Sequence, residues 1–328
     1  MKKRTINGIL GMLLLMSTAA GLCFGSAPLS LAAVWEAVTG AGDSTTAIIL
    51  WQLRLPRVAA GILAGVGLST AGVLLQTVTA NDLAGPNIIG INSGAGLAVI
   101  WTLTVAPTAG KLLPIGAFLG AFGAALVILL AADRLGSSRT GVLLIGIAIT
   151  TLLNAAISFL SLLDEGVLAQ YNHFTVGSLK GIRMGELAVP AVIIGLAFLA
   201  SLALSGRLRV LCLGDAAAAA LGIRVKKLRI LALACAAACA AAVVSFAGLL
   251  GFVGLVVPHI GRRLVGQDPG RLLPTAALTG AVILVLADLL GRTLVAPSEL
   301  PVGILMSIIG APYFLILLLR RKQYAGIS

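Results

Sequence analysis

Charged residues are what this chain of 328 residues lacks most. Only 10% of its residues are Asp, Glu, Lys or Arg, whereas 59% are hydrophobic and the mean hydropathy is +1.10. Soluble domains carry about 25% charged residues, because their surfaces face water. The scarcity of charge therefore excludes a soluble protein and predicts a polytopic membrane protein.

Cysteine and histidine are also scarce, and nucleotide-binding motifs are absent from the sequence. The four cysteines do not form a disulfide framework, and Cys235 and Cys239, one helical turn apart, are typical of close helix packing. The histidines, His173 and His259, have no neighbour at metal-ligand spacing. No G-x-x-x-x-G-K-[ST] sequence occurs, so the chain has no P-loop with which to hydrolyse ATP. We therefore expect no metal site, no cofactor and no intramembrane enzyme.

Apolar runs recur along the chain at lengths that suit membrane spans, for which a helix needs roughly 20 apolar residues. The eighth run is the least distinct, because residues 228–266 form one apolar block that only Gly248 and Gly251 divide. The expected spans are 6–26, 55–78, 88–107, 112–132, 141–163, 188–206, 228–248, 249–266, 272–294 and 302–320.

This pattern predicts an all-α polytopic membrane protein of about ten transmembrane helices. The chain reads as a single transmembrane domain, 1–328, because its longest polar segments are too short to fold alone. Five spans in each half, 1–163 and 188–328, suggest two inverted repeats, an arrangement common among transporters.

The basic residues predict the orientation of these helices. Most of the 23 Lys and Arg residues lie at the chain ends, in alternate loops and in the 207–227 segment. The positive-inside rule then puts both termini in the cytoplasm and accounts for the basic excess without a nucleic acid partner. Trp35, Trp51 and Trp101 fall at the opposite interface, as an aromatic belt would. The basic N-terminus and first apolar run also fit a cleavable signal peptide, which would leave an odd number of spans.

Three arginines lie at the outer ends of predicted spans, where positive charge is unusual. Arg54 and Arg57 flank Pro56 at the mouth of the second span, and proline at a helix start would make a rigid corner there. Arg292 lies near the outer end of the ninth span, four residues after Asp288. This spacing leaves open a simple i, i+4 ion pair between Asp288 and Arg292.

The longest predicted cytoplasmic loop contains the sequence LGDAAAAALGI, residues 213–223. Asp215 is placed as an N-cap and Gly222 as the residue after the last turn, so the segment predicts a two-turn alanine helix. A helix this short does not persist alone in water. It must pack against the ends of the protein's own helices or against another protein.

A polar stripe runs along the fifth predicted span. Thr151, Asn154, Ser158 and Ser161 are spaced by three and four residues, which puts them on one helix face. Such residues either hydrogen-bond neighbouring helices together or line a polar pathway.

The most informative stretch is residues 247–274, AGLLGFVGLVVPHIGRRLVGQDPGRLLP. An apolar Gly-rich run meets Pro258 and His259, then reaches Arg262 and Arg263 in a short polar turn. Pro258 can break helical regularity near the inner end of a span. We expect a structural hydrogen-bonding role for His259 and anchoring at the cytoplasmic surface for the two arginines.

This stretch resembles the signature of the FecCD-type permeases, the membrane subunits of bacterial ABC importers for iron-siderophores, haem and cobalamin. The resemblance covers the whole chain and includes RLPR at 54–57, NDLAGPNIIGINSGAG at 81–96, VGSLKG at 176–181 and LPVGILMSIIGAPYFLILLLRR at 300–321. Asp82, Phe174 and Leu249 depart from the family's usual Pro, Trp and Pro, and QDPGR replaces a commoner Asp-His-Arg.

The resemblance implies roles for the residues above. Arg54, Arg57 and Arg292 become docking residues for glutamates of an extracytoplasmic substrate-binding protein, since exposed cations steer an acidic partner. The fifth span would line the central pathway. The 207–227 segment becomes the coupling segment that contacts the ATPase subunit, through Gly214, Asp215, Ala218, Ala219, Leu221 and Gly222.

The function implied is a non-catalytic permease subunit in the bacterial cytoplasmic membrane, working with ATP-binding cassette subunits, a binding protein and a second permease in a homo- or heterodimer. Iron-siderophore complexes are the commonest substrates of the family, with haem and cobalamin as alternatives. An ion-coupled secondary transporter is the other class to consider. Such transporters place ionisable residues at mid-membrane, however, and the predicted spans offer only Asp288, toward one end.

Overall fold

The computed structural model describes residues 2–25, 29–40, 43–86, 90–134 and 139–325, and in these ranges it contains helices and turns but no strand. Each of the ten predicted apolar runs coincides with a helix. Residue 26, at the end of the first run, and residues 88–89, at the start of the third, lie outside the described residues. The helices are α1 (Lys2–Cys23), α4 (Leu55–Thr79), α5 (Ile91–Val105), α6 (Leu113–Arg134), α7 (Arg139–Ser161), α9 (Met184–Leu211), α11 (Val225–Ala247), α12 (Val253–Val265), α13 (Pro269–Thr293) and α14 (Val302–Ala325).

Within the described ranges, seven helical segments are long and apolar enough to cross a membrane, and they include α1, α4, α6, α7, α9, α11 and α13. The other three helices are shorter in their apolar part: α5 has 15 residues, α12 has 13, and the apolar part of α14 is Val302–Ile316. At 1.5 Å per residue α12 is only about 20 Å long, less than the roughly 30 Å hydrocarbon core. A multi-pass membrane protein is therefore clear, and the count of ten spans remains a prediction.

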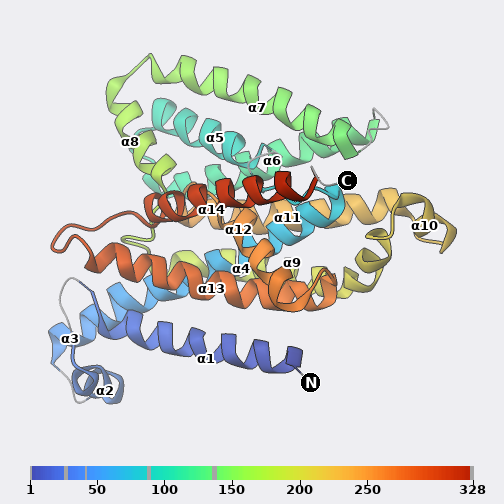
Figure 1. The fold of residues 1–328 in the computed structure, drawn as a ribbon. Helices are drawn as coiled ribbons and strands as arrows, with labels where there is room; N and C mark the ends of the chain where they lie inside the picture. The colour runs from blue at the N-terminus through green and yellow to red at the C-terminus, as the bar shows by residue number, and fades with distance from the viewer. Residues whose placement is uncertain (1, 26–28, 41–42, 87–89, 135–138, 326–328) are drawn as a thin grey trace.

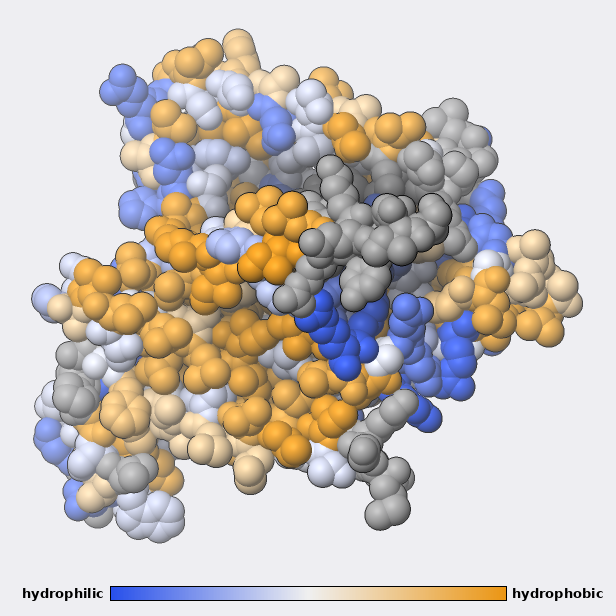
Figure 2. All heavy atoms as spheres, viewed as in Figure 1, coloured by the Kyte–Doolittle hydropathy of each residue, from blue (hydrophilic) through white to orange (hydrophobic). Residues whose placement is uncertain are grey.

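Short elements connect the long helices at the two ends of the bundle. They are α2 (Leu31–Thr39), α3 (Ser44–Ile48), the π-helical turn η1 (Ile49–Arg54), the 3-10 turn η3 (Gly110–Leu112), α8 (Glu165–Val176) and α10 (Asp215–Ala220). Figure 1 shows α2, α3 and α8 toward one end, and α10 with the start of α1 and the end of α14 toward the other. Figure 2 shows hydrophobic residues over the middle of the bundle and hydrophilic residues gathered toward its ends.

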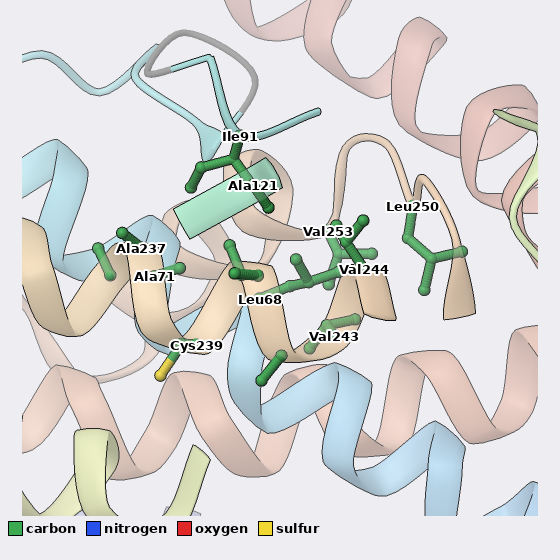
Figure 3. Packing of buried hydrophobic residues seen from close by; sticks show 14 of the residues in the cluster. Leu68, Ala71, Ile91, Ala121, Ala237, Cys239, Val243, Val244, Leu250 and Val253 are labelled. Atoms are coloured by element: carbon green, nitrogen blue, oxygen red, sulfur yellow. The ribbon is translucent and has the colours of Figure 1, made fainter. Parts of the chain in front are cut away.

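Helix α4 is the central helix, and it packs against α9, α11, α12 and α13. Leu68 and Ala71 of α4 form one buried cluster with Cys239 and Val243 of α11 (Figure 3). Lipid tails are as apolar as leucine, so helices in a membrane associate through close van der Waals contact of small residues. Cys239 is fully buried in this interface, as the close-packing interpretation of the Cys235–Cys239 pair predicted.

Two glycines of α4 show how close this packing is. A Cβ atom on Gly65 would overlap the backbone of Gly280 in α13, and one on Gly72 would overlap the carbonyl of Gly254 in α12. In the neighbouring pair of helices, Gly94 of α5 meets Gly120 of α6 in the same way. These positions require glycine because two backbones approach there without room for any side chain.

Two of the shorter helices, α5 and α12, begin in the same way. Helix α5 follows Gly90, and α12 follows Phe252, and both N-cap residues adopt the left-handed conformation, with φ of 68° and 63°. Both helices are short and are separated from the long helix before them, since α4 ends at Thr79 and α11 at Ala247. Paired short helices at corresponding positions are typical of transporter repeats.

Candidate functional site

The start of α4 and the end of α13 meet at a buried cluster of ions. The Nε atom of Arg57 donates hydrogen bonds to both carboxylate oxygens of Asp288, over 2.9 and 3.0 Å. Its Nη1 atom donates to Oε2 of Glu299 over 2.9 Å. Arg292 Nε lies 3.2 Å from Asp288 Oδ2. Asp288 therefore holds two arginines at once, and it is 2% exposed.

All three arginines predicted for docking belong to this region, but their environment differs from the predicted one. Arg54, Arg57 and Arg292 are 5%, 8% and 3% exposed, so none is the exposed cation expected at a helix mouth. Arg54 Nη1 donates to the carbonyl of Leu22, and Arg292 Nη2 donates to that of Gly21, over 3.2 Å. The end of α1 thus covers Arg54 and Arg292 and accepts a hydrogen bond from each, which offsets part of the cost of burying a charge.

The i, i+4 pair that the sequence left open is present, with additional partners. Asp288 pairs with Arg292 on its own helix and with Arg57, which is 231 positions away in the chain. Glu299 precedes α14, and it accepts from Arg57 and lies 3.8 Å from Nζ of the exposed Lys180. Sequence reasoning missed Glu299, because no spacing rule links it to a residue 242 positions earlier.

Pro56 lies in the first turn of α4, as predicted, but the chain does not enter the helix through an open corner there. Helical structure begins at Ser44 and runs through α3 and η1 into α4, so Pro56 lies in the first turn after a π-helical turn. A proline has no N–H to donate and its ring crowds the preceding turn, and a wider π-turn is one way in which a helix accommodates it. The result places Arg54 and Arg57 toward α1 and α13 instead of toward open solvent.

At the opposite end of the bundle, the predicted alanine helix is present as α10 (Asp215–Ala220). Its N-cap residue is Gly214, with φ of 108°, and not Asp215 as predicted. Asp215 occupies the first helical position, where its carboxylate favours the positive end of the helix dipole and accepts from Arg229 over 2.9 Å. Gly222 has φ of 79° and follows the last turn, as the sequence indicated.

The two sides of α10 differ in exposure. Ala218 is fully buried against the ends of the protein's own helices, whereas Ala219 and Ala220 are exposed. Leu213 and Leu221 flank the helix and are 70% and 66% exposed. The helix is therefore fixed by one alanine face and presents small side chains and two exposed leucines on the other.

The polar stripe predicted for the fifth span lies on α7. Thr151, Asn154 and Ser158 are exposed and Ser161 is partly buried. The hydroxyls of Thr151 and Ser161 donate to carbonyls one turn earlier, over 2.9 and 2.8 Å. The stripe therefore faces away from the helices of this chain, and in this structure it does not join α7 to a neighbour.

Pro258 lies inside α12, which continues through it from Val253 to Val265. The helix is not broken, in contrast to the expectation from sequence. Proline leaves the carbonyl four residues earlier without its usual donor. That carbonyl belongs to Gly254, and the side-chain amide of Gln76 in α4 lies 3.5 Å from it and 3.3 Å from the carbonyl of Leu255. Gln76 therefore supplies the donor that Pro258 cannot.

The side-chain amide of Gln76 also accepts a hydrogen bond from Arg262, one of the two arginines that follow His259. Arg262 Nη2 donates to Oε1 of Gln76 over 2.6 Å, and its Nη1 lies 3.2 Å from Oδ1 of Asp82. Asp82, for which the sequence gave no physical explanation, is the counter-ion of Arg262, on the loop after α4. Arg262 is thus mostly buried in a network, while Arg263 is exposed as predicted.

His259 does not have the hydrogen-bonding role expected for it. Its Nε2 atom is buried and has no hydrogen-bond partner within the described part of the chain. The ring instead packs edge-on against Tyr313 of α14, with ring centroids 6.1 Å apart. Among the described residues no group of three His, Cys, Asp or Glu side chains could hold a metal ion.

A model of the FecCD transport family matches residues 13–320. The chain belongs to this family. The permease protein HmuU of the hemin transport system of Yersinia pestis is 36% identical over 326 residues, 98% of this chain and 97% of that protein. The permease protein YfmE of the Fe(3+)-citrate import system of Bacillus subtilis is 37% identical over 94% of this chain and 93% of its own length.

A further relative is the permease protein FepD of the ferric enterobactin transport system of Escherichia coli, 35% identical over 98% of this chain and 96% of that protein. Among solved structures, an inward-facing metal-chelate type ABC transporter matches with a TM-score of 0.88 at 30% identity, over 97% of this chain and 99% of that chain. These matches confirm the resemblance that the motifs predicted, and they give the chain the fold of an ABC transporter permease.

Proposed function

We propose that this chain is the permease subunit of an ATP-driven importer for iron-siderophore complexes in the bacterial cytoplasmic membrane. The observation that carries the proposal is the length of the family match, residues 13–320, since it spans the outer ion cluster, α10 and the helices between them. The relatives named above import iron-citrate, ferric enterobactin and hemin. Hemin and cobalamin are the alternative substrates for this chain.

The topology proposed is ten spans with both termini in the cytoplasm and two inverted five-helix halves. Three observations support it. The start of α1 and the end of α14 lie toward the end of the bundle that carries α10 (Figure 1). The exposed Trp35, Trp51 and Trp101 suit an outer aromatic belt. The matching starts of α5 and α12 suit a repeat.

ATP hydrolysis is assigned to partner chains that contact α10. The exposed face of this helix, with Ala219, Ala220 and Leu221, would sit in a groove of the ATPase subunit. Ala218 would transmit the movement, because it packs against the permease's own helices. The exposed polar stripe of α7 would line a pathway shared with a second permease subunit.

Docking of the binding protein is assigned to Arg54, Arg57 and Arg292. Because Arg57 is buried in ion pairs with Asp288 and Glu299, a glutamate of the partner would have to replace Glu299 at Arg57. The cluster suits such an exchange, since its three arginines exceed its two carboxylates, Asp288 and Glu299, by one charge. The held Asp288 also argues against ion-coupled transport, because its two arginine partners leave it little freedom to bind and release an ion.

The substrate is tested by growing a deletion strain under iron limitation with individual siderophores, hemin or cobalamin as the supplement. Growth restored by the plasmid-borne gene with one ferric siderophore supports the proposal, and rescue with hemin or cobalamin alone would reassign the substrate.

Charge reversal at Arg57 should weaken uptake by impairing docking. Unchanged binding-protein affinity in that variant would remove its docking role.

A further inference from the structure

A basic pocket lies where α9 and α11 leave the membrane at the end that carries α10. Its cavity volume is about 380 Å³, and it is lined by Arg207, Gly222, Ile223, Arg224, Lys227, Leu228 and Leu231. Arg207 is in the last turns of α9, and Arg224 and Lys227 are at the start of α11. Both helices are long and apolar enough to span a membrane, so the pocket is at the level where lipid headgroups lie.

The three cations of this pocket differ in their ion pairing from neighbouring arginines. Arg209 pairs with Asp268, and Arg229 pairs with Asp215, each over 2.9 Å. In the part of the chain that the structure describes, Arg207, Arg224 and Lys227 have no carboxylate within ion-pair distance. Three like charges around one cavity repel each other, and an anion bound between them removes that repulsion.

The remaining lining of the pocket is apolar. Leu228 is buried at its base, and Leu231, one turn further into α11, is 50% exposed. A free phosphate ion would gain nothing from these leucines. A phospholipid would gain binding free energy from both the cations and the leucines. Its headgroup phosphate can meet the cations while an acyl chain lies along Leu231.

We infer that this pocket binds the phosphate headgroup of an anionic phospholipid of the cytoplasmic leaflet. The inference rests on the proposed orientation, because anionic lipids attract basic segments at the cytoplasmic surface. Gly222 lines the pocket and lies two residues after the end of α10, so the bound lipid holds the corner between α10 and α11. Anionic lipid thereby positions the segment that is assigned to the ATPase.

The test is native mass spectrometry of the purified chain released from nanodiscs with equal amounts of phosphatidylcholine and phosphatidylglycerol. The wild-type chain should retain phosphatidylglycerol in preference. Replacing Arg224→Gln or Lys227→Gln should reduce that preference by about fivefold each, and the triple variant with Arg207→Gln should abolish it. Arg263→Gln is the control, since Arg263 is exposed at the same end and does not line the pocket.

The inference would be overturned if the wild-type chain showed no preference for phosphatidylglycerol, or if the triple variant kept the wild-type preference. It would also be overturned if excess inorganic phosphate displaced the lipid, or if added ATPase subunit displaced it. The last two would assign the pocket to a free anion or to a protein contact. Melting temperatures equal to that of the wild type show that the variants fold. The readout does not depend on transport, so failure of the importer assignment would be seen separately, in the uptake experiments.

Discussion

At the end of the bundle near Glu299, the arginines predicted for docking are buried, with Arg57 and Arg292 both paired to Asp288, whereas at the opposite end α10 presents exposed small side chains. The arginine cluster is therefore a closed site, and under the proposed function a partner would open it by replacing an internal carboxylate. Helix α10 is an open site, and the proposed ATPase contact would cover it without breaking an existing contact. Under this proposal, association at the arginine cluster costs more free energy than association at α10. It also discriminates more between partners.

The largest effect is expected from Asp288→Asn, which removes the shared counter-ion of Arg57 and Arg292. Breaking a buried ion pair costs about 3–5 kcal/mol, and here both arginines lose Asp288 while Arg57 is left with Glu299. The free energy of unfolding in mixed micelles measures the loss. The control is Asp82→Asn, whose side chain is 51% exposed and whose pair with Arg262 should contribute roughly 1 kcal/mol or less. Equal losses of unfolding free energy in the two variants would contradict the conclusion that buried ion pairs hold the arginine cluster closed.

The next effect is expected from Gly72→Ala. A Cβ atom at this position meets the carbonyl of Gly254, so α4 and α12 must separate, at a cost of about 1–3 kcal/mol. Separation also removes Gln76 from the carbonyl that Pro258 leaves free. Gly195→Ala in α9 is the matched control, because no atom lies within 4 Å of its added Cβ. Its unfolding free energy should stay the same or rise, and a loss equal to that of Gly72→Ala would show that backbone proximity is not the cause.

Ala219→Glu tests the open site. The side chain is exposed, so the variant should fold normally but lose about tenfold in ATP-driven uptake, equivalent to roughly 1.4 kcal/mol, because a charge enters the ATPase contact. Ala219→Ser is the control and should retain uptake. Ala218→Glu, in contrast, should destabilise the chain itself, since Ala218 is fully buried. Wild-type uptake by Ala219→Glu would remove this surface from the coupling site.

The smallest effect is expected from Glu299→Gln at the closed site. Removing the carboxylate that competes for Arg57 should tighten binding-protein docking about twofold to fivefold, since a partly exposed ion pair contributes roughly 1 kcal/mol or less. This variant changes only the carboxylate that competes for Arg57, whereas charge reversal at Arg57 also breaks its ion pair with Asp288. Glu165→Gln, at an exposed carboxylate on α8, should leave the dissociation constant unchanged. Weaker docking in Glu299→Gln would mean that Glu299 holds Arg57 in its docking geometry.

The helices could be predicted from the sequence, because a helix depends on the residues of its own segment. Apolar runs and glycines are visible in those residues. Each predicted run coincides with a helix, and even the uncertain division at Gly248 and Gly251 falls between α11 and α12. The sequence was also sufficient to find α10, although the cap fell on Gly214 and not on Asp215. Helix capping depends on one residue's backbone, and neighbouring candidates cannot be separated by type alone.

Pairings between distant residues could not be predicted in the same way. The link from Arg57 to Glu299 and the link from Arg262 to Asp82 join residues 242 and 180 positions apart, and a single sequence has no spacing that reports such contacts. Burial was missed for the same reason. Arg54 looks like an exposed cation until the end of α1 is seen to cover it.

The most direct test of the whole account is uptake into proteoliposomes that contain the purified chain, with and without its ATPase and binding protein. The account predicts that ferric siderophore enters only when both partners are present and ATP is supplied on the side that carries α10. Uptake by the chain alone, driven by a proton or sodium gradient, would contradict it.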